Sequence, residues 1–275
     1  MTGRSAPTDA ARRRTVLVLA LLGLGGGLLL WSAATDLLRV PAYVLPSPLA
    51  VGRALAAGLA HGPLDPGGFW FHAGVTVAEA AAGFVLGSVS GILAGLALAH
   101  WRLLEQLAYP YVVAFQALPK VAVAPLLVIW FGFGLEGKIV ITAVMTFFPL
   151  MVNMVAGYQS VEPERLELAR ACNATTAQML RKIVLPSAMP FIFAGLNVAS
   201  VLAILGAIVG EFVGAESGLG TLLMQYDQAM QIAPLFAVLI LLGAIGYLFN
   251  AGIRAIERRV CFWAQRAGAP EAGGL

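Results

Sequence analysis

The sequence predicts an all-α integral membrane protein with six transmembrane helices. Two observations lead to this fold class. First, 60% of the residues are hydrophobic and only 11% are charged, whereas a soluble domain carries roughly 25% charged residues. Second, the apolar residues gather into runs long enough to cross a bilayer as helices. The net charge of +3 and the pI near 9.1 do not point to nucleic acid, because the basic residues are distributed by membrane side.

The chain begins with a predicted N-terminal tail, residues 1–15, which ends in a cluster of arginines. The apolar run 16–34 follows and is predicted to be the first transmembrane helix. A cleaved signal peptide and a twin-arginine signal are alternatives, but the run is long and no small-residue cleavage site is evident. Residues 35–72 are predicted to form an external, proline-rich segment, in which Ser47-Pro48 opens a short amphipathic helix at the membrane surface.

Residues 73–253 are predicted to form a five-helix core. Its first helix, 73–99, has a glycine at every fourth residue, namely Gly83, Gly87, Gly91 and Gly95. This ladder leaves one stripe of the helix almost without side chains, so that another helix can approach closely. We interpret the ladder as a helix crossing within one subunit; a seam between two copies is the alternative.

The next predicted span, 108–131, contains three prolines and Lys120. Prolines free backbone carbonyls, and a lysine at membrane depth is costly, so both features favour a position beside protein or a water-filled path. The last three spans are predicted at 138–158, 189–209 and 234–253, and a tail follows at 254–275.

The basic residues predict the orientation of these spans. With both termini inside, all lysines and arginines fall on the cytoplasmic side except Arg39, Arg53, Lys138 and the unassigned Lys120. An excess of positive charge on cytoplasmic loops is the general rule. The sequence therefore predicts a multi-pass protein of the bacterial inner membrane with cytoplasmic termini and a cytoplasmic loop at 161–187.

This loop reads as two short helices joined by a tight turn. Glu162-Pro163-Glu164 is a typical helix start, because proline fits the first turn and acidic groups favour the positive end of the helix dipole. Asn173 is placed to end the first helix in the left-handed conformation. Thr175 and Gln178 have capping-box spacing, and Leu185-Pro186 is predicted to stop the second helix.

The loop resembles the cytoplasmic loop of permease subunits of bacterial ATP-binding-cassette (ABC) importers. Their signature is Glu-Ala-Ala, three residues, Gly, nine residues, Ile, one residue and Leu-Pro. Every spacing is kept here, at Glu167, Leu168, Ala169, Asn173, Ile183, Leu185 and Pro186. Leu168 and Asn173 depart from the signature, but Asn enters the left-handed region cheaply. The stretches LPSP at 45–48, QALPKVAVAPLLVIWFGFG and GEFVGAESGLG also look like the sulfonate, nitrate, taurine and thiamine-precursor permease group.

The resemblance implies a type I ABC importer permease fold and a set of partners. These are a second permease copy in a homodimer, two separate ATPase subunits and an external substrate-binding protein. ATP and Mg²⁺ would bind to the ATPases, and this chain would bind no cofactor. The residues implied to couple the chain to the ATPases are Glu164, Glu167, Ala169, Asn173, Ala174, Ile183, Leu185 and Pro186.

The substrate is constrained only by resemblance. The stretches AIVGEFVGAESGLG and FFPLMVN lean toward permeases for thiamine pyrimidine precursors or riboflavin rather than those for sulfonates, nitrate or taurine.

No catalytic or metal-binding constellation is evident, so we expect a transport subunit and not an enzyme. GFGLEGK at 132–138 fits a phosphate-binding loop up to its lysine, but Ile139 follows where Ser or Thr is required, and no strand precedes it. His61, His72 and His100 are scattered and are interpreted as interfacial or solvated.

Lys120, Glu79 and Glu211 are the ionisable residues predicted within or at the edge of the bilayer. We hypothesise that Glu211 and Lys120 line or gate the translocation path as an ion pair, together with Gln116 and Asn153. The alternative is that each charge is paired elsewhere and serves folding.

Two other classes of membrane protein fit the sequence less well. An ion-coupled secondary transporter needs acidic relays within the membrane and usually has internal repeats, and neither is convincing here. A structural scaffold has no use for the spaced cytoplasmic motif. Dependence of uptake on an ATPase partner would separate the importer from both.

Overall fold

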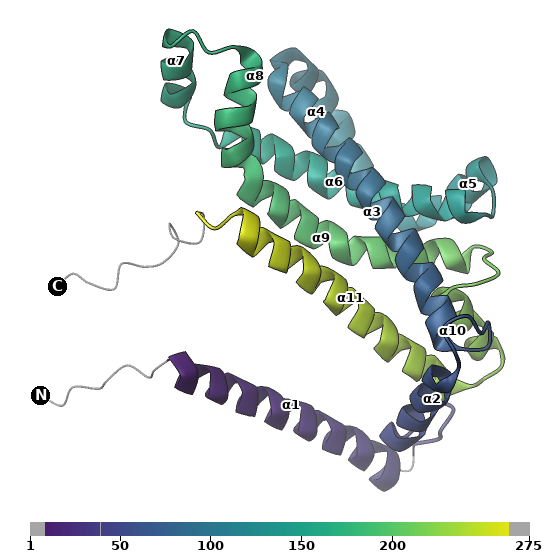
Figure 1. Cartoon of the computed structure of the whole chain (residues 1–275). Helices are drawn as coiled ribbons and strands as arrows, with labels where there is room; N and C mark the ends of the chain where they lie inside the picture. Colours follow the sequence, from purple (N-terminus) through teal and green to yellow (C-terminus); the bar gives the residue numbers. More distant parts are fainter. Residues whose placement is uncertain (1–8, 39, 264–275) are drawn as a thin grey trace, which may run out of the picture.

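The computed structural model describes the backbone of residues 9–38 and 40–263, and within these ranges it consists of helices and connecting turns without strands. Residues 1–8 and 264–275, parts of the predicted tails, lie outside the described residues. Helices α3 (Phe69–His100), α6 (Leu135–Gln159) and α9 (Leu185–Phe212) form the centre of the molecule (Figure 1). Helix α11 (Ile232–Val260) runs beside α9, and α1 (Asp9–Leu37) lies apart from them. The short helices α7 (Pro163–Ala171) and α8 (Thr176–Met179) project at one end, and α2 (Pro48–Ala60) and α10 (Leu219–Gln228) lie at the other.

Four helical segments in the described part are long and apolar enough to cross a membrane. They are α3 (Phe69–His100), α6 (Leu135–Gln159), the continuous segment Thr176–Phe212 and α11 (Ile232–Val260). A fifth span results if α4 (Arg102–Ala117) and α5 (Lys120–Phe131), which meet at a bend of 98°, are taken as one. The bend lies at Leu118-Pro119, as expected where proline breaks a helix.

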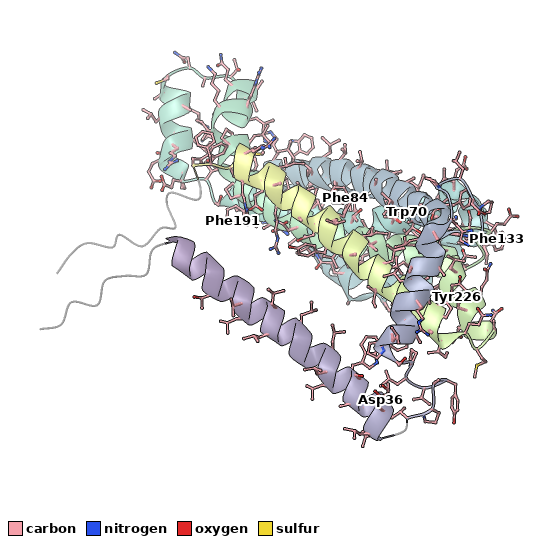
Figure 2. The ribbon with its side chains drawn as sticks, turned by 60° about the horizontal axis from the view of Figure 1, so that its bottom comes forward. Asp36, Trp70, Phe84, Phe133, Phe191 and Tyr226 are labelled. Carbon is pink, nitrogen blue, oxygen red and sulfur yellow. The ribbon has the colours of Figure 1, made fainter. Side chains whose placement is uncertain are left out.

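The sixth predicted span corresponds to α1 (Asp9–Leu37), whose apolar part Leu21–Leu37 is shorter than the four segments above. Most of the described side chains of α1 before Trp31 are exposed (Figure 2). Its main anchors are the Trp31 indole N–H, which donates to the Pro46 carbonyl at 3.0 Å, and the Trp31 ring, 6.0 Å from that of Phe236. Six spans and cytoplasmic termini stay predictions.

The glycine ladder of α3 faces α6 of the same chain. A Cβ built on Gly83, Gly87, Gly91 or Gly95 would lie within 3.0 Å of an atom of α6. Small residues of α9 also pack against α6, because Gly195 contacts Asn153 and Gly206 contacts Thr142. Close backbone approach maximises dispersion contacts where lipid supplies no hydrophobic drive. The glycines, which lack side chains, thus allow the three central helices to pack in close contact.

Helix α11 and the short helices cover this centre. Phe84 of α3 packs edge-to-face on Phe249 of α11, with ring centroids 5.3 Å apart (Figure 2). The predicted amphipathic helix is α2 (Pro48–Ala60); Ser47 caps it by accepting from the Ala50 N–H at 3.3 Å. Its Gly58 packs against Phe69, whose ring in turn meets Tyr226 of α10 (Leu219–Gln228). At this end of the molecule, α2, α3 and α10 are therefore packed together through the Phe69 ring.

Candidate functional site

The predicted coupling loop forms a helical hairpin. Helix α7 (Pro163–Ala171) has no buried residue. The Nε of its Arg165 lies 2.8 Å from Oε2 of Glu162, the residue just before the helix. Glu164, Glu167 and Leu168 are exposed. Helix α7 thus exposes one leucine and two acids where it projects from the body.

Asn173 makes the turn after α7, with φ of 56°. The Asn173 N–H donates to the Arg170 carbonyl at 2.9 Å, and the Ala174 N–H donates to the Ala169 carbonyl at 3.0 Å. These two bonds are the Schellman pattern that closes helix C-termini, normally with glycine at the left-handed position. Asparagine therefore replaces the glycine of the importer signature without loss of the turn.

The second helix of the loop begins with the expected capping box but does not end where expected. Thr175 and Gln178 cap each other's backbone N–H at the start of α8 (Thr176–Met179). The prediction that Leu185-Pro186 stops the helix is wrong. A π-helical turn, Leu180–Val184, joins α8 to α9 (Leu185–Phe212), and the Leu185 N–H donates to the Leu180 carbonyl.

The π turn explains how the helix passes the proline. Pro186 lacks an N–H and its ring crowds the preceding turn, and a π turn shifts the hydrogen-bond pattern by one residue just before it. Of the remaining signature residues, Ile183, Leu185 and Pro186 are half-buried, as are Ala169 and Ala174. The continuous helical segment Thr176–Phe212, called the helical rod below, therefore connects the loop directly to the apolar span.

The four residues hypothesised to line the path are not gathered at one place. Lys120 lies 5.4 Å from the ring centroid of Phe148 and lines a mainly apolar cavity of about 660 Å³. Gln116 lines a different cavity of about 310 Å³, and Asn153 packs against α9 while donating to the Pro149 carbonyl at 2.8 Å. Among the described ion pairs none joins Lys120 to Glu211, so that predicted pair is wrong.

Glu211 instead fastens the start of α10 to α3. Its carboxylate accepts the Thr76 hydroxyl at 2.6 Å and the Gly220 N–H. The Leu219 N–H donates to Thr76 Oγ1 at 2.9 Å, and the Gly218 N–H donates to His72 Nδ1 at 2.9 Å. Three successive backbone donors that begin a helix are thus satisfied by side chains of other helices.

His72 and the glycines of this segment serve the same fastening. His72 is only 5% exposed, and its Nε2 lies 2.9 Å from the Pro66 carbonyl, so of the two predicted environments the solvated one is wrong, and the interfacial one stays a prediction. A Cβ on Gly218, where φ is 131°, would collide with the Glu211 carboxylate, and one on Gly220 would lie 2.7 Å from Glu211 Oε2. The sequence Gly218-Leu219-Gly220 is therefore required by the approach of this carboxylate.

A buried ion pair lies beside Glu211. Lys138 Nζ donates to Glu79 Oε1, and the two residues are 7% and 1% exposed. Gly210 of α9 packs directly on the Lys138 stem. The sequence predicts Lys138 outside, at the end of a span, and does not predict this pair. The available signal was Glu79 itself, since a buried acid requires a partner.

We expect Glu211→Gln to fold like the wild type and Glu211→Leu to lose about 1–3 kcal/mol of unfolding free energy. The amide of glutamine can accept the Gly220 N–H and donate to Thr76 Oγ1, whose own proton then turns to the His72 carbonyl, 3.1 Å away. Leucine leaves the Gly220 N–H unpaired. Unfolding in detergent measures the difference, and Glu216→Leu, an exposed acid of the same connection, is the control. Equal stability of the two Glu211 variants would contradict this assignment.

The comparisons agree with this architecture. Residues 87–261 match the family model described as "Binding-protein-dependent transport system inner membrane component". A riboflavin transport system permease protein of Chloroflexus aurantiacus is 37% identical over 236 residues, which cover 86% of each chain. A formylaminopyrimidine transport permease protein of Halalkalibacterium halodurans is 33% identical and covers 87% of this chain and 93% of its own. The inward-facing MetNI methionine ABC transporter contains a similar fold, with a TM-score of 0.60 and 23% identity over 76% of this chain and 96% of that one.

Proposed function

Because this chain belongs to the family of inner membrane components of binding-protein-dependent transport systems, we propose that it is coupled to separate ATPase subunits through α7 and α8. The chain is an ABC importer permease for a small solute, as the resemblance predicted. It is a transport component and not an enzyme. In this proposal ATP and Mg²⁺ bind to two ATPase partners, and a second copy of the chain and an external binding protein complete the transporter.

The observation that supports the coupling is the unbroken helix from Thr176 to Phe212. In the proposal, α7 docks on the ATPase with Glu167 toward basic or polar groups. Closure of the ATPases displaces the loop, and the rod transmits that displacement into the membrane. Because packed helices switch between discrete arrangements rather than bend, α9 then shifts against α6. The outer end of α9 contains Glu211, which binds the start of α10. A shift of α9 therefore also moves α10 at the external face.

The proposed orientation places this loop in the cytoplasm, together with the end of α11, which lies near α8 in Figure 1, and the start of α1, which points away from α2. For the substrate we propose a small organic molecule of the riboflavin or pyrimidine-precursor kind, ahead of sulfonates, nitrate and taurine. This choice is supported by two relatives that are named for riboflavin and formylaminopyrimidine transport.

The deciding experiment is co-purification of the full-length chain with its ATPase in detergent. We expect a stoichiometric complex for the wild type, and at least about tenfold weaker retention, roughly 1.4 kcal/mol, for Glu167→Ala and Asn173→Pro. The first change removes an exposed acid of α7, and the second abolishes the turn because proline excludes φ of 56°.

Glu136→Ala, an acid in the first turn of α6, is the matched control. If no ATPase is retained, or if both loop variants retain it like the control, the coupling proposal fails and an ion-coupled transporter becomes the leading alternative.

A further inference from the structure

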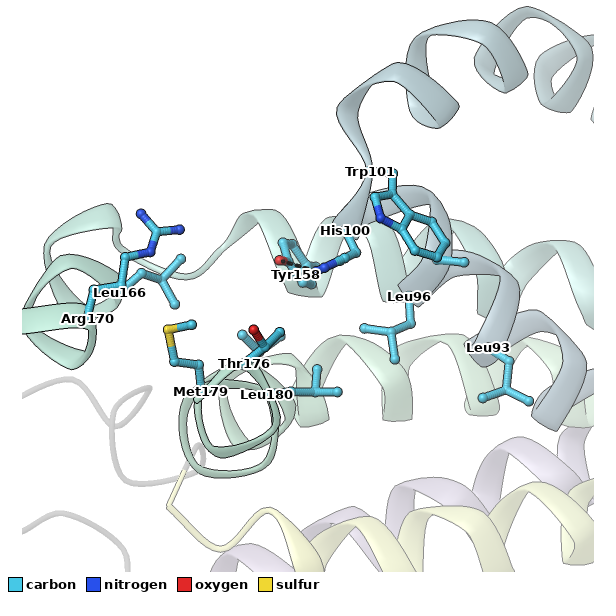
Figure 3. Close-up of a pocket in the computed structure, with 12 residues that line it drawn as sticks. Leu93, Leu96, His100, Trp101, Tyr158, Leu166, Arg170, Thr176, Met179 and Leu180 are labelled. Carbon is cyan, nitrogen blue, oxygen red and sulfur yellow. Dashed lines mark hydrogen bonds between the residues drawn. The ribbon is translucent and has the colours of Figure 1, made fainter. Parts of the chain in front are cut away.

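A cavity of about 490 Å³ lies between the coupling loop and the ends of the membrane helices. We call it the loop-side cavity. Figure 3 shows Leu166 and Arg170 of α7 on one side and His100, Trp101 and Tyr158 on another. Its volume is within the range of about 300–1,000 Å³ that is common for small-ligand sites.

The walls of the loop-side cavity divide into an apolar and a polar part. The apolar part is formed by Leu93, Leu96 and Ala97 of α3 together with Met179, Leu180 and Val184 of the helical rod. Leu93 is 60% exposed, so this part of the cavity opens at the surface of α3. A molecule that fits here therefore has an apolar portion lying along α3.

The polar part is a rim of aromatic rings and one cation. His100 and Tyr158 are joined by a contact of 3.4 Å between Nδ1 and the hydroxyl, and Trp101 packs edge-on against His100. Aromatic residues of this kind collect where membrane helices meet the headgroup layer. The Trp and Tyr side chains of the rim therefore suit the depth at which a phospholipid carries its phosphate.

Arg170 supplies a positive charge without an acidic partner among the described residues, whereas Arg165 of the same helix is paired with Glu162. The two arginines face different cavities, since Arg165 lines a separate one together with Lys182 and Trp263. A guanidinium binds phosphate through several N–H donors. Basic pockets between membrane helices are a recognised setting for anionic headgroups.

From this combination we propose that the loop-side cavity binds an anionic phospholipid, with its phosphate at Arg170 and an acyl chain along Leu93 and Leu96. The bound lipid bridges α3 and α6 to α7 and α8, which otherwise project from the body. It thereby fixes the distance of the coupling loop from the membrane helices. Binding of the lipid is independent of the proposed function; only its effect on coupling rests on that proposal.

The test uses the delipidated full-length chain and phosphatidylglycerol or phosphatidylcholine, with bound lipid counted by native mass spectrometry. We expect the wild type, Arg165→Gln and Arg170→Lys to prefer phosphatidylglycerol. Arg170→Gln is expected to bind it about fivefold more weakly, the loss expected for one basic residue near an anionic surface. Both arginines lie on the exposed helix α7, so neither change threatens the fold.

Three results would overturn the proposal. One is equal binding by Arg170→Gln and Arg165→Gln, and another is equal binding of the two lipids. The third is displacement of the lipid by millimolar inorganic phosphate, which would indicate a site for the free anion. Since the ATPase is absent from this measurement, failure of the coupling proposal appears only in the co-purification, and failure of the lipid proposal appears only here.

Discussion

Replacement of Lys138 by methionine is expected to lower the unfolding free energy by about 3–5 kcal/mol, the usual effect of breaking a buried ion pair on one side. The change leaves Glu79, 1% exposed, without its partner. Glu79 Oε2 already has no hydrogen bond among the described groups, and the Glu211 carboxylate lies in the same cluster. Unfolding of the purified chain by heat or by graded denaturing detergent measures the loss.

The double variant Glu79→Leu/Lys138→Met is expected to recover most of that loss. Replacing both members of a buried pair by apolar residues is often neutral, whereas the single changes leave a charge behind. The control is Lys120→Met. Lys120 lies in another span, and its one described partner is an aromatic ring, so this change is expected to lower the unfolding free energy by only about 1 kcal/mol. Additive losses from the two single changes would show that Glu79 and Lys138 are not coupled.

The elements that the sequence predicts well are those specified by neighbouring residues. The turn at Asn173 and the cap at Thr175 each depend on hydrogen bonds within five residues, so local patterns contain the whole signal. The same reasoning fails at Pro186. The rule that proline ends a helix assumes the hydrogen-bond pattern of an α-helix. The π turn before Pro186 changes that pattern, so the rule does not apply there.

The charged residues show where prediction from sequence stops. Glu79 stands in an apolar run, and Lys138 and Glu211 stand near the ends of two others. The identity of each partner depends on how α3, α6 and α9 cross. Hydropathy recognises that a charge in a span requires a partner, but it does not say which one. Position in a span alone favours a pair of Lys120 and Glu211, whereas the helix crossing places Glu211 beside Thr76 and Gly220.

The glycine ladder yields the other large expected effect. We expect Gly91→Ala to cost about 1–3 kcal/mol, as for overpacking of a tight core. A Cβ there would collide with the Phe147 carbonyl and lie 3.0 Å from Leu150 Cβ, and a backbone carbonyl has no rotamer by which to withdraw. The double variant Gly87→Ala/Gly91→Ala is expected to lose about 5 kcal/mol or more of unfolding free energy, which is close to the whole stability of a typical domain. Monodisperse yield in detergent and resistance to unfolding report both.

Gly74→Ala supplies the matched control on the same helix, since no atom lies within 4 Å of a Cβ there. Alanine is the better helix former by up to about 1 kcal/mol, so this change is expected to be neutral or stabilising. The contrast also decides between the two interpretations of the ladder. If Gly91→Ala keeps the stability of the single chain but abolishes pairing with a second copy, the glycines serve a seam between subunits. Loss of stability before any loss of pairing places their role where the structure has them, between α3 and α6.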